Sequence, residues 1–461
     1  MRAHGSPARL VGAVLVLACW GCGFEGLSQS ESGGVRPPDT QIAAGHTQIM
    51  EAVNLRLRII PRSGGSAVDR SIFDIIHPGC NTTGGAISDP RLHYDTFSSR
   101  FFFVVLHAPA GTSTPGAWCL SVSATSDALG TWYRYRIAMP NAPNSSGTLV
   151  PAFPGYPGLG VGEDKVVLTG NPASGGFLLY AAHSTIAALN KSQVLAGVTV
   201  SVNYFTGPYD TSKLFLLQPA NVLDATSTGN VHSFGVNAAA ANPSTLRRYR
   251  VSGIPPSSTV QMTAISFTGN WKAPLFARQP DSATNGYLDA LDGRVLHAVF
   301  RDGKITLVAC VACDNSTRTC IRVVRLDGAT ITAFYNFGNQ AKDYFFPAVT
   351  VDAALNQLIV FNASSDSEPA SVYITGRRPT DPPQTLRTPR LVKAGIGSYW
   401  DGRCSRPCNC IFGNCNRWGD YSGVAVDAAN QLDSWAAAEY PIGLNTWGTW
   451  IEFLNHNNFP Q

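Results

Sequence analysis

The chain has 461 residues and a nearly balanced charge, with 34 basic and 30 acidic side chains and a net charge of +4. Only 14% of the residues are charged, and the Lys and Arg residues are scattered, which argues against the clustered basic surface that nucleic-acid binding requires. The 44 Gly and 30 Pro residues supply many turns, so the composition favours a large, turn-rich fold.

Residues 1–19 have the pattern of an export signal, because a short apolar run flanked by Arg residues ends at Cys19 and is too short to span a bilayer. Val16-Leu17-Ala18-Cys19 resembles the bacterial lipobox, whose Cys carries the lipid of the mature protein, and Cys22 is the alternative lipidation site. The prediction is an exported bacterial protein, either a lipoprotein of the outer membrane or cell surface, with the lipid as its membrane attachment, or a secreted protein. Residues 20–44 are polar and unpatterned, which predicts a flexible tether.

Residues 45–461 are predicted to form one all-β domain, a β-propeller. A strand with apolar residues two apart, an Asp- or Gly-bearing turn and a more apolar strand recur along the chain, and residues 349–358 closely match residues 424–432. Residues 295–337 show the whole unit, four β-rich strands joined by short turns. Repeated four-stranded units are typical of propellers, and the length suits seven blades, with six or eight blades or a pair of β-sandwiches as alternatives.

The blades are expected to begin near residues 45, 89, 156, 218, 287, 344 and 417. The last blade shows only three strands in the sequence. The strand that it lacks is expected from residues 48–60, because a ring closed in this way has no exposed strand edge.

Several motifs resemble, in their order along the chain, a group of exported bacterial propeller-like proteins that carries no settled activity. They are SDPRLHYDTFSSRFFFVV, LDALDGRVLHAVFRDGK, YFFPAVTVD, RWGDYSGVAVD, AAAEY and WGTWI. The resemblance covers residues 45–453 and implies the propeller fold and export. The Cys-rich loop 404–415 departs from the form of the motif. Residues 126–132 have a weaker similarity to the Asp-box turn of sialidase-type propellers, where that turn is remote from catalysis.

Disulfides are expected because the chain is predicted to enter an oxidising compartment. The candidate residues are Cys80, Cys119, Cys310, Cys313, Cys320, Cys404, Cys408, Cys410 and Cys415. Cys320 is expected to pair with Cys310 or Cys313 on the same hairpin, which leaves the other for Cys80 or Cys119. The four Cys residues of the loop lack the paired C-x-x-C spacing of zinc sites, so the loop is predicted to hold two disulfides.

The segment 417–422 is the main candidate for a ligand site. Trp418 and Tyr421 could stack on a sugar or aromatic ring, while Arg417 and Asp420 could fix its polar groups. The alternative is a turn with buried aromatic residues and an internal ion pair.

Arg91, Arg294 and Arg377 also lie at predicted strand edges, where loops of different blades can converge with Arg417 on a substrate carboxylate, as sialidase-like chemistry requires. Glu439 is a candidate partner for them. The alternative is that the arginines brace neighbouring blades through carboxylates such as Asp95 or Asp427.

No H-E-x-x-H, P-loop or G-x-S-x-G motif is present, so no catalytic residue is assigned. No metal or other cofactor is predicted, with calcium in Asp-rich turns as an open alternative at Asp302, Asp314, Asp343 or Asp366. The sequence therefore favours a monomeric binding or interaction module for a glycan or protein ligand. The alternatives are a glycan-acting hydrolase or lyase, which needs two carboxylates about 5–10 Å apart, and a structural envelope component.

Overall fold

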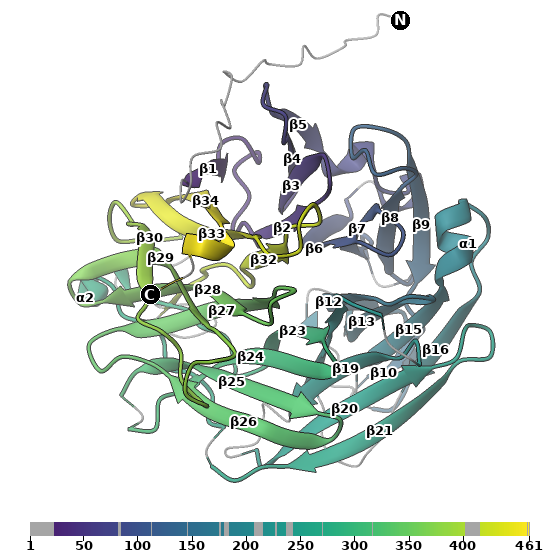
Figure 1. Ribbon diagram of the computed structural model, residues 1–461. Coiled ribbons are helices and arrows are strands. Elements are labelled where there is room, and N and C mark those ends of the chain that lie inside the picture. Colours follow the sequence, from purple (N-terminus) through teal and green to yellow (C-terminus); the bar gives the residue numbers. More distant parts are fainter. Residues whose placement is uncertain are drawn as a thin grey trace, which may run out of the picture.

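The computed structural model shows a seven-bladed β-propeller in which every blade is built on a four-stranded antiparallel sheet (Figure 1). The residues that it describes are 23–81, 84–111, 113–144, 146–174, 177–178, 184–206, 215–225, 228–236, 243–269, 271–315, 317–401, 415–458 and 460. The all-β, seven-bladed prediction is confirmed. Among the described residues, no helix has the length and apolar character needed to cross a membrane.

The strands of each blade are given from the channel outwards. Blades 1 to 3 comprise β2 (Gln41–Ala44), β3 (Gln48–Val53), β4 (Arg56–Pro61) and β5 (Val68–Ser71); β6 (Ala86–Asp95), β7 (Arg100–Ala108), β8 (Ala117–Ser123) and β9 (Trp132–Ala138); and β12 (Phe153–Val161), β13 (Lys165–Ser174), β15 (Thr185–Asn190) and β16 (Val202–Thr206). Blades 4 and 5 comprise β17 (Phe215–Pro219), β19 (Val231–Val236), β20 (Thr245–Ser252) and β21 (Thr259–Ser266); and β23 (Val295–Arg301), β24 (Lys304–Ala312), β25 (Thr319–Asp327) and β26 (Thr330–Phe337).

Blades 6 and 7 comprise β27 (Asp343–Val351), β28 (Gln357–Ser365), β29 (Glu368–Arg377) and β30 (Arg390–Lys393); and β32 (Gly423–Val426), β33 (Ser434–Gly443), β34 (Thr446–Leu454) and β1 (Gly23–Ser28). The short elements are β10 (Ala142–Pro143), β11 (Leu149–Val150), β14 (Phe177–Leu178), β18 (Asn221–Val222), β22 (Tyr287–Leu288), β31 (Cys415–Asn416), α1 (Lys191–Ala196), α2 (Ser282–Asn285) and 3-10 turns at Ile72–Asp74, Pro78–Cys80 and His456–Asn458. Strand β18 runs parallel to β23 and adds to blade 5.

The core lies between blades, and β7 shows why its sequence is apolar at consecutive positions. Phe101 and Phe103 pack in a cluster with residues of blade 1, whereas Phe102 and Val104 pack in a cluster with residues of blade 3. Successive side chains of a strand point to opposite faces, so a strand that is covered on both faces carries a continuous apolar run. Burial of these side chains against two neighbours stabilises the ring.

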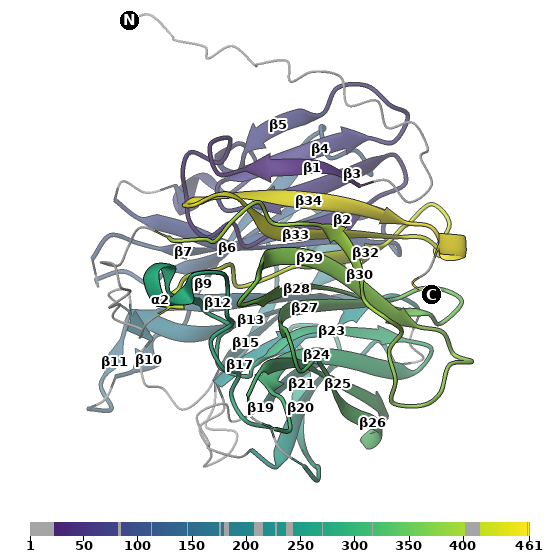
Figure 2. The ribbon, with the colours of Figure 1, turned by 90° about the vertical axis from the view of Figure 1, so that its left-hand side faces the viewer.

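The N-terminal segment closes the ring, although by a different strand from the one predicted. β1 pairs antiparallel with β34 and completes blade 7 (Figure 2). The prediction that residues 48–60 close the ring is wrong, because they form β3 and β4 inside blade 1. The tether predicted for 20–44 is also wrong for residues 23–44, which hold β1 and β2, so the propeller begins at residue 23 of the described chain rather than at 45.

Side-chain contacts fix β1 in place. The buried Glu51 of β3 accepts a hydrogen bond from the Leu27 amide at 2.9 Å and bonds to the Thr449 hydroxyl of β34. One carboxyl group therefore joins blade 1 to both strands of the closure. The sequence of β1, GFEGLS, has few apolar residues, which explains why its periodicity does not mark it as a strand.

Two disulfides are formed among the described residues, Cys80–Cys119 and Cys313–Cys320. Cys310 is a free buried thiol whose sulfur accepts a hydrogen bond from the Phe346 amide. The expectation that one Cys of the hairpin pairs with Cys80 or Cys119 is therefore wrong. The candidates Cys19, Cys22, Cys404, Cys408 and Cys410 lie outside the described residues, as does the side chain of Cys415.

The Asp-box-like segment is a packed turn between β8 and β9. The Asp127 carboxylate accepts a hydrogen bond from the Leu129 amide at 2.9 Å, and the Trp132 indole donates to the Ala128 carbonyl at 3.0 Å. Trp132 is 5% exposed. These contacts give the segment a structural role at the rim of blade 2.

Candidate functional site

One end of the channel carries a dense group of charged and aromatic side chains, which we call the polar cluster. Its members are Asp39, Asp89, Arg91, Tyr156, Asp289, Asp292, Arg294, Arg417, Asp420, Tyr421 and Glu439. Apart from Glu439, which lies on β33, they come from the inner strands or from the segments that lead into them, namely β2, β6, β12, β23 and β32. Because the inner strands of a propeller surround one channel, their entry segments meet at the same end of it.

Arg417 is the centre of the cluster and joins two blades. It donates to the Asp289 carboxylate at 2.8 Å and to the Asp420 carboxylate at 2.6 Å. The pairing of β22 with β31 brings these segments together, and the Asp401 carboxylate accepts the Arg417 backbone amide at 2.9 Å. The Arg417 side chain keeps 23% of its surface exposed, so the cluster is open to solvent at this point.

Three carboxylates from blades 1, 2 and 7 lie close together behind this arginine. The carboxylate oxygens of Asp39, Asp89 and Asp420 lie within 4.8 Å of one another. Asp39 accepts the Asp420 amide at 2.8 Å and the Asn54 side-chain amide at 2.6 Å, which fixes its orientation. Burial and the charges of Asp420 and Asp89 raise the pKa of Asp39 well above its usual range.

Glu439 extends the acidic region along the backbone of residues 419–420. Its carboxylate accepts the Gly419 amide at 2.9 Å, and a β-carbon at Gly419 would lie 3.0 Å from that oxygen, so the close approach suits glycine. Burial and the charge of Asp39 raise the pKa of Glu439 well above its usual range. Among the described residues, its other oxygen has no hydrogen-bond partner.

Two tyrosines and two arginines alternate on the other side of the cluster. The Arg91 guanidinium lies 3.5 Å from the ring centre of Tyr421, and Arg294 lies 4.2 Å from that of Tyr156. The two tyrosine rings are 4.8 Å apart. Arg294 forms a two-point ion pair with Asp292 at 2.7 and 2.6 Å.

Some polar atoms of this layer are unsatisfied within the described part of the chain. Arg91 donates from Nε to the Pro157 carbonyl at 2.8 Å, but its Nη2 has no partner there. The Tyr421 hydroxyl likewise has none, whereas the Tyr156 hydroxyl donates to the Asp420 carbonyl at 3.3 Å. Buried polar atoms usually have a partner, so the two unsatisfied donors suggest that water or a ligand completes this layer.

The structure brings most of the predicted site residues together, and two of them do not take the predicted place. Arg91, Arg294, Arg417, Asp420, Tyr421 and Glu439 all belong to the polar cluster. Trp418 is 1% exposed, packs edge-on against Tyr399 and donates to the Asn362 side chain at 3.1 Å, so it has no free face for stacking. Arg377 lies at the end of β29 and donates to the carbonyls of residues 381 and 382, away from the cluster.

Neither tyrosine offers an open stacking face. Tyr421 is 4% exposed and its ring face is covered by Arg91, so the predicted contact between this ring and a sugar is also not available. The two bracing carboxylates named from the sequence do pair with cations, but Asp95 pairs with Lys191 and Asp427 pairs with Arg62. Of the candidate arginines, Arg417 joins two blades through a different acid, Asp289, whereas Arg294 pairs with Asp292 of its own segment.

Five members of the cluster were not predicted from the sequence: Asp39, Asp89, Tyr156, Asp289 and Asp292. Four of them had a signal, because Asp89 stands two residues before Arg91, Asp289 and Asp292 share the LDALDGR motif with Arg294, and Tyr156 marks a predicted blade start. Asp39 falls within residues 20–44, which the sequence predicts to be a flexible tether, so nothing in the sequence assigns it to a site.

The trio Asp39, Asp89 and Asp420 has the geometry to hold a metal ion. It is a different set from the calcium alternative, because Asp302, Asp314, Asp343 and Asp366 form no such group within the described residues. Asp343, for example, pairs with Arg318 at 3.1 Å.

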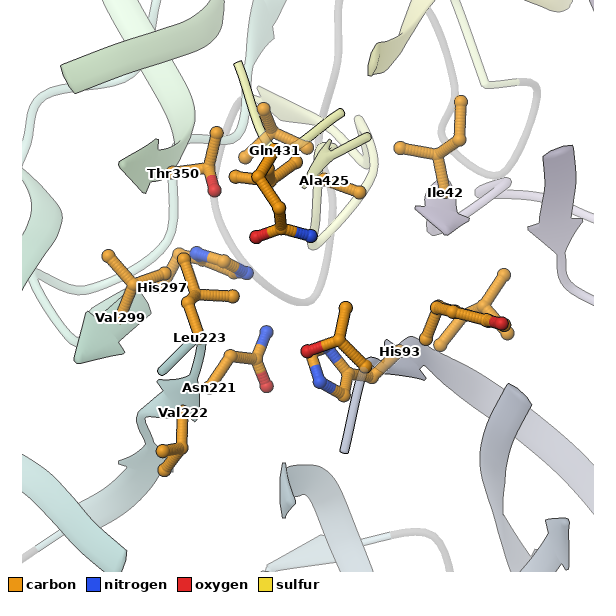
Figure 3. Close-up of a pocket in the computed structure, with 15 residues that line it drawn as sticks. Ile42, His93, Asn221, Val222, Leu223, His297, Val299, Thr350, Ala425 and Gln431 are labelled. Atoms are coloured by element: carbon orange, nitrogen blue, oxygen red, sulfur yellow. The ribbon is translucent and has the colours of Figure 1, made fainter. Parts of the chain in front are cut away.

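A small cavity of about 30 Å³ lies farther along the channel, where the inner strands end (Figure 3). We call it the channel cavity. Its polar lining comprises His93 on β6, His297 on β23, Asn221 on β18, Thr350 on β27 and Gln431 from the turn after β32, together with Tyr94 and Thr96. The channel cavity is therefore lined by histidines and uncharged polar side chains, and Arg91 of the polar cluster lies near enough to help lower the pKa of His297.

Comparison with known proteins supports no assignment of family or activity. No protein-family model and no curated protein matches the chain. Similar solved structures include the Hadza microbial sialidase Hz136, with 11% identity, 89% of this chain and 74% of that chain covered and a TM-score of 0.43. The intramolecular trans-sialidase from Ruminococcus gnavus has 8% identity, coverages of 82% and 96% and a TM-score of 0.43.

A Trypanosoma rangeli sialidase mutant has 9% identity and a TM-score of 0.37, with 79% of this chain covered. The chain spans about half of that protein, 53% of its length. Identities and TM-scores this low carry no argument about activity or substrate.

Proposed function

We propose that this protein is an exported binding module whose polar cluster holds an uncharged, hydroxyl-rich glycan at the mouth of the propeller channel. The observation that carries the proposal is the convergence of carboxyl and guanidinium groups from four blades around the partly exposed Arg417. Carboxylates accept hydrogen bonds from hydroxyl groups, whereas guanidiniums and protonated carboxyls donate to them. The cluster therefore offers both kinds of partner that a sugar needs.

The charge balance favours an uncharged ligand. Six acids and three arginines make up the cluster, but burial and neighbouring charges raise the pKa of Asp39, Asp89 and Glu439. These raised pKa values reduce the negative charge that the six acids set against the three arginines. The guanidinium groups of Arg294 and Arg417 already pair with acids of the cluster. The acids are Asp289, Asp292 and Asp420, and these pairs leave little attraction for an anionic sugar.

A hydrolase is the second candidate, and the Asp39 group favours it. The Asp39 carboxyl has a raised pKa, which suits a general acid, and its oxygens lie within 4.8 Å of those of Asp89 and Asp420, which are potential nucleophiles. Retaining glycosidases place their two carboxyls about 5–5.5 Å apart. In this scheme Asp39 donates its proton to the leaving oxygen, and Asp89 or Asp420 attacks the sugar carbon.

The test is a glycan-binding and turnover screen on the full chain. Asp89→Asn and Arg417→Lys should each weaken binding at least tenfold, because they remove an acceptor and a two-point donor. Asp302→Asn is the matched control, since Asp302 lies in the exposed turn between β23 and β24. Turnover by the wild type that is lost in Asp89→Asn would favour the hydrolase. No binding and no turnover by a folded wild type would overturn both candidates and favour a structural envelope role.

Export and lipidation are part of the proposal, and the disulfides Cys80–Cys119 and Cys313–Cys320 support an oxidising compartment. If Cys19 carries the lipid, only residues 20–22 separate it from β1, and three residues span at most about 10 Å. The propeller would then sit directly at the membrane surface. Intact-mass measurement of the mature protein tests this: a diacylated N-terminus at Cys19 is expected, and an unlipidated N-terminus would indicate secretion. We also expect a monomer.

A further inference from the structure

We propose that a pocket between blades 5 and 6 binds a tetrahedral oxyanion of the phosphate or sulfate class. The pocket has a volume of about 210 Å³ and lies where the inner strands β23 and β27 end, whereas the polar cluster lies mainly in the segments that lead into the inner strands. We call it the arginine pocket. Its charged and hydroxyl-bearing lining residues are Arg301, Asp302, Lys304, Thr306, Arg325 and Arg377.

The strand register of blade 5 explains why these side chains meet. Arg301 lies opposite Lys304 across the hairpin of β23 and β24, and Arg325 of β25 lies opposite Thr306 of β24. Paired residues share a face of a sheet, as do residues two apart on one strand, so all four side chains lie on one face of blade 5. Val299, two residues before Arg301, packs in a cluster with residues of blade 6. This face is therefore the one that blade 6 covers.

Three arginines reach the pocket without a carboxylate partner. Among the described residues, Arg301, Arg325 and Arg377 form no ion pair, although Arg301 and Arg377 are only 9% and 8% exposed. Arg301 donates to the Val351 carbonyl and to the Gln431 side chain, both at 3.0 Å. Arg377, at the end of β29 in blade 6, donates to two backbone carbonyls of the following loop at 2.8 and 3.3 Å. Neutral oxygens satisfy these donors but do not neutralise the buried charges.

Arg325 carries the unsatisfied donor of the pocket. Its buried Nε has no hydrogen-bond partner among the described residues. Burial and the charge of Arg377 lower the pKa of Arg325, so the fold holds two like charges near each other. Buried polar atoms usually have a partner. A water molecule would satisfy Nε but leave the repulsion, whereas a bound anion satisfies the donor and offsets both charges.

Two acids at the edge of the pocket already have partners. Asp302 is the one carboxylate among the described residues that line it, and it pairs with Lys304 at 3.3 Å. Asp381, whose backbone carbonyl accepts from Arg377, forms two hydrogen bonds with Arg387 at 2.7 and 2.8 Å through its carboxylate.

Two further acids offset only part of the charge of Arg301. The charges of Asp224 and Asp352 act to raise its pKa, but burial has the larger effect and the pKa of Arg301 is lowered. The lining therefore sets four cations against one carboxylate, and this excess of positive charge favours an anionic ligand.

The donors and the size of the pocket select the class of anion. A guanidinium presents a planar fork of N–H donors that matches the oxygens of a phosphate or a similar oxyanion. Because the guanidiniums come from two blades, they suit a group with oxygens on several sides better than a planar carboxylate. A volume of about 210 Å³ is below the roughly 300–1,000 Å³ of pockets for drug-sized ligands, so the pocket fits one such group, either free or carried by a larger molecule.

The experiment is isothermal titration calorimetry of the full chain with sodium sulfate and with sodium phosphate in a chloride buffer of constant ionic strength. One anion per chain is expected. Arg325→Gln and Arg377→Gln keep a polar side chain but remove a charge, and each should weaken binding at least tenfold. Arg134→Gln, which changes an exposed arginine on β9, is the matched control and should leave the affinity unchanged.

A melting curve in chloride alone adds a readout that separates anion binding from a structural role of Arg325. The variant Arg325→Gln relieves the repulsion from Arg377, so its melting temperature should equal or exceed that of the wild type. A clear fall would show that Arg325 stabilises the fold without an anion and would contradict the proposal. If Arg377→Gln fails to fold, Arg325→Gln decides the question.

Two calorimetric results would also overturn the proposal. The first is a wild type that binds neither anion. The second is binding that survives in both folded variants, which would place the anion elsewhere, for example at Arg417. A further titration with a sulfated monosaccharide identifies the source of the group: tighter binding than inorganic sulfate indicates a group carried on a sugar, and weaker binding indicates the free ion. The outcome does not depend on glycan binding by the polar cluster.

Discussion

The polar cluster and the channel cavity accommodate buried polar side chains in different ways. The polar cluster buries charges and balances them, as Arg417 does with Asp289 and Asp420. The channel cavity buries the imidazoles of His93 and His297, and burial lowers the pKa of both, which favours their neutral form. Removing one member of a buried ion pair leaves its partner as an unpaired buried charge, whereas removing a neutral imidazole leaves no such charge.

The comparison also gives the two ends opposite pH dependence. Glu439 and Asp39 in the polar cluster have a raised pKa, so rising pH works against the folded state there. The two histidines of the channel cavity have a lowered pKa, so falling pH works against the folded state there. The free energy of unfolding should therefore depend on the cavity histidines in acid and on the cluster carboxyls in alkali.

The largest effect should come from Arg417→Ala. The change leaves the carboxylates of Asp289 and Asp420 without their cation, and we expect the free energy of unfolding to fall by about 3 kcal/mol. The matched control is Arg387→Ala, since Arg387 also pairs with a carboxylate, Asp381, and its side chain is 24% exposed against 23% for Arg417. Arg387 and Asp381 both lie in the segment between β29 and β30, so this pair does not join blades and its loss should cost about 0–1 kcal/mol. Urea unfolding at pH 7 measures both, and equal losses would contradict the distinction between an ion pair within one segment and one that joins two blades.

The next effect should come from acid acting on the two histidines of the channel cavity. With a pKa of about 4 in the folded chain and about 6.5 in the unfolded chain, each histidine contributes stability that is full above pH 6.5 and is lost as the pH falls towards 4. Between pH 7 and pH 5 each should cost roughly 2 kcal/mol. Urea unfolding of His93→Asn and His297→Asn at the two pH values should show a smaller loss than in the wild type.

His232 provides the control for this prediction. Burial lowers its pKa to about 4 as well, but it lies on β19 and outside the channel cavity. Its contribution should remain in both variants. Parallel pH profiles for the wild type and the two variants would show that the histidines of the cavity are not held in neutral form.

A smaller effect, of opposite sign, is expected for Glu439→Gln. The folded pKa of Glu439 lies above its unfolded value, so its contribution to stability is present below about pH 4.5 and is lost as the pH rises towards the folded pKa. Gln keeps the acceptor for the Gly419 amide and stays neutral. The variant should match the wild type at pH 5 and be more stable at pH 8, by on the order of 1 kcal/mol. Thermal melts at the two pH values measure this, and a variant less stable at pH 8 would mean that the charged carboxylate is needed.

Most of the fold could be predicted from the sequence because its signals are local. Asp-Gly turns and alternating apolar residues mark individual hairpins, so a predicted blade start such as residue 344 lies beside the observed strand start at Asp343. The closure of the ring could not be found in this way. β1 is six residues long, and what makes it a strand is its partner β34, more than four hundred residues away in the sequence.

The polar cluster shows the same limit. Arg417 and Asp420 are neighbours in the sequence and were found together, but the partner that joins blades 5 and 7, Asp289, becomes visible only when the propeller is closed. Trp418 was misplaced for a related reason. An aromatic residue in a polar motif has the same sequence pattern whether its ring faces solvent or packs on Tyr399, and only the packing decides.

The smallest effect, and the one that separates a structural role of the polar cluster from a ligand-binding role, is expected for Tyr421→Phe. The Tyr421 hydroxyl is buried and has no partner among the described residues, so its removal should leave the free energy of unfolding within about 0.5 kcal/mol of the wild type or raise it. Tyr156→Phe is the matched control, because the Tyr156 hydroxyl donates to the Asp420 carbonyl and its loss should cost about 1 kcal/mol. If the unsatisfied hydroxyl serves a ligand, Tyr421→Phe should weaken glycan binding while stability is unchanged. A loss of stability at Tyr421 as large as that at Tyr156 would mean that the hydroxyl has an internal water as its partner, and the charged end of the channel would then be complete without a ligand.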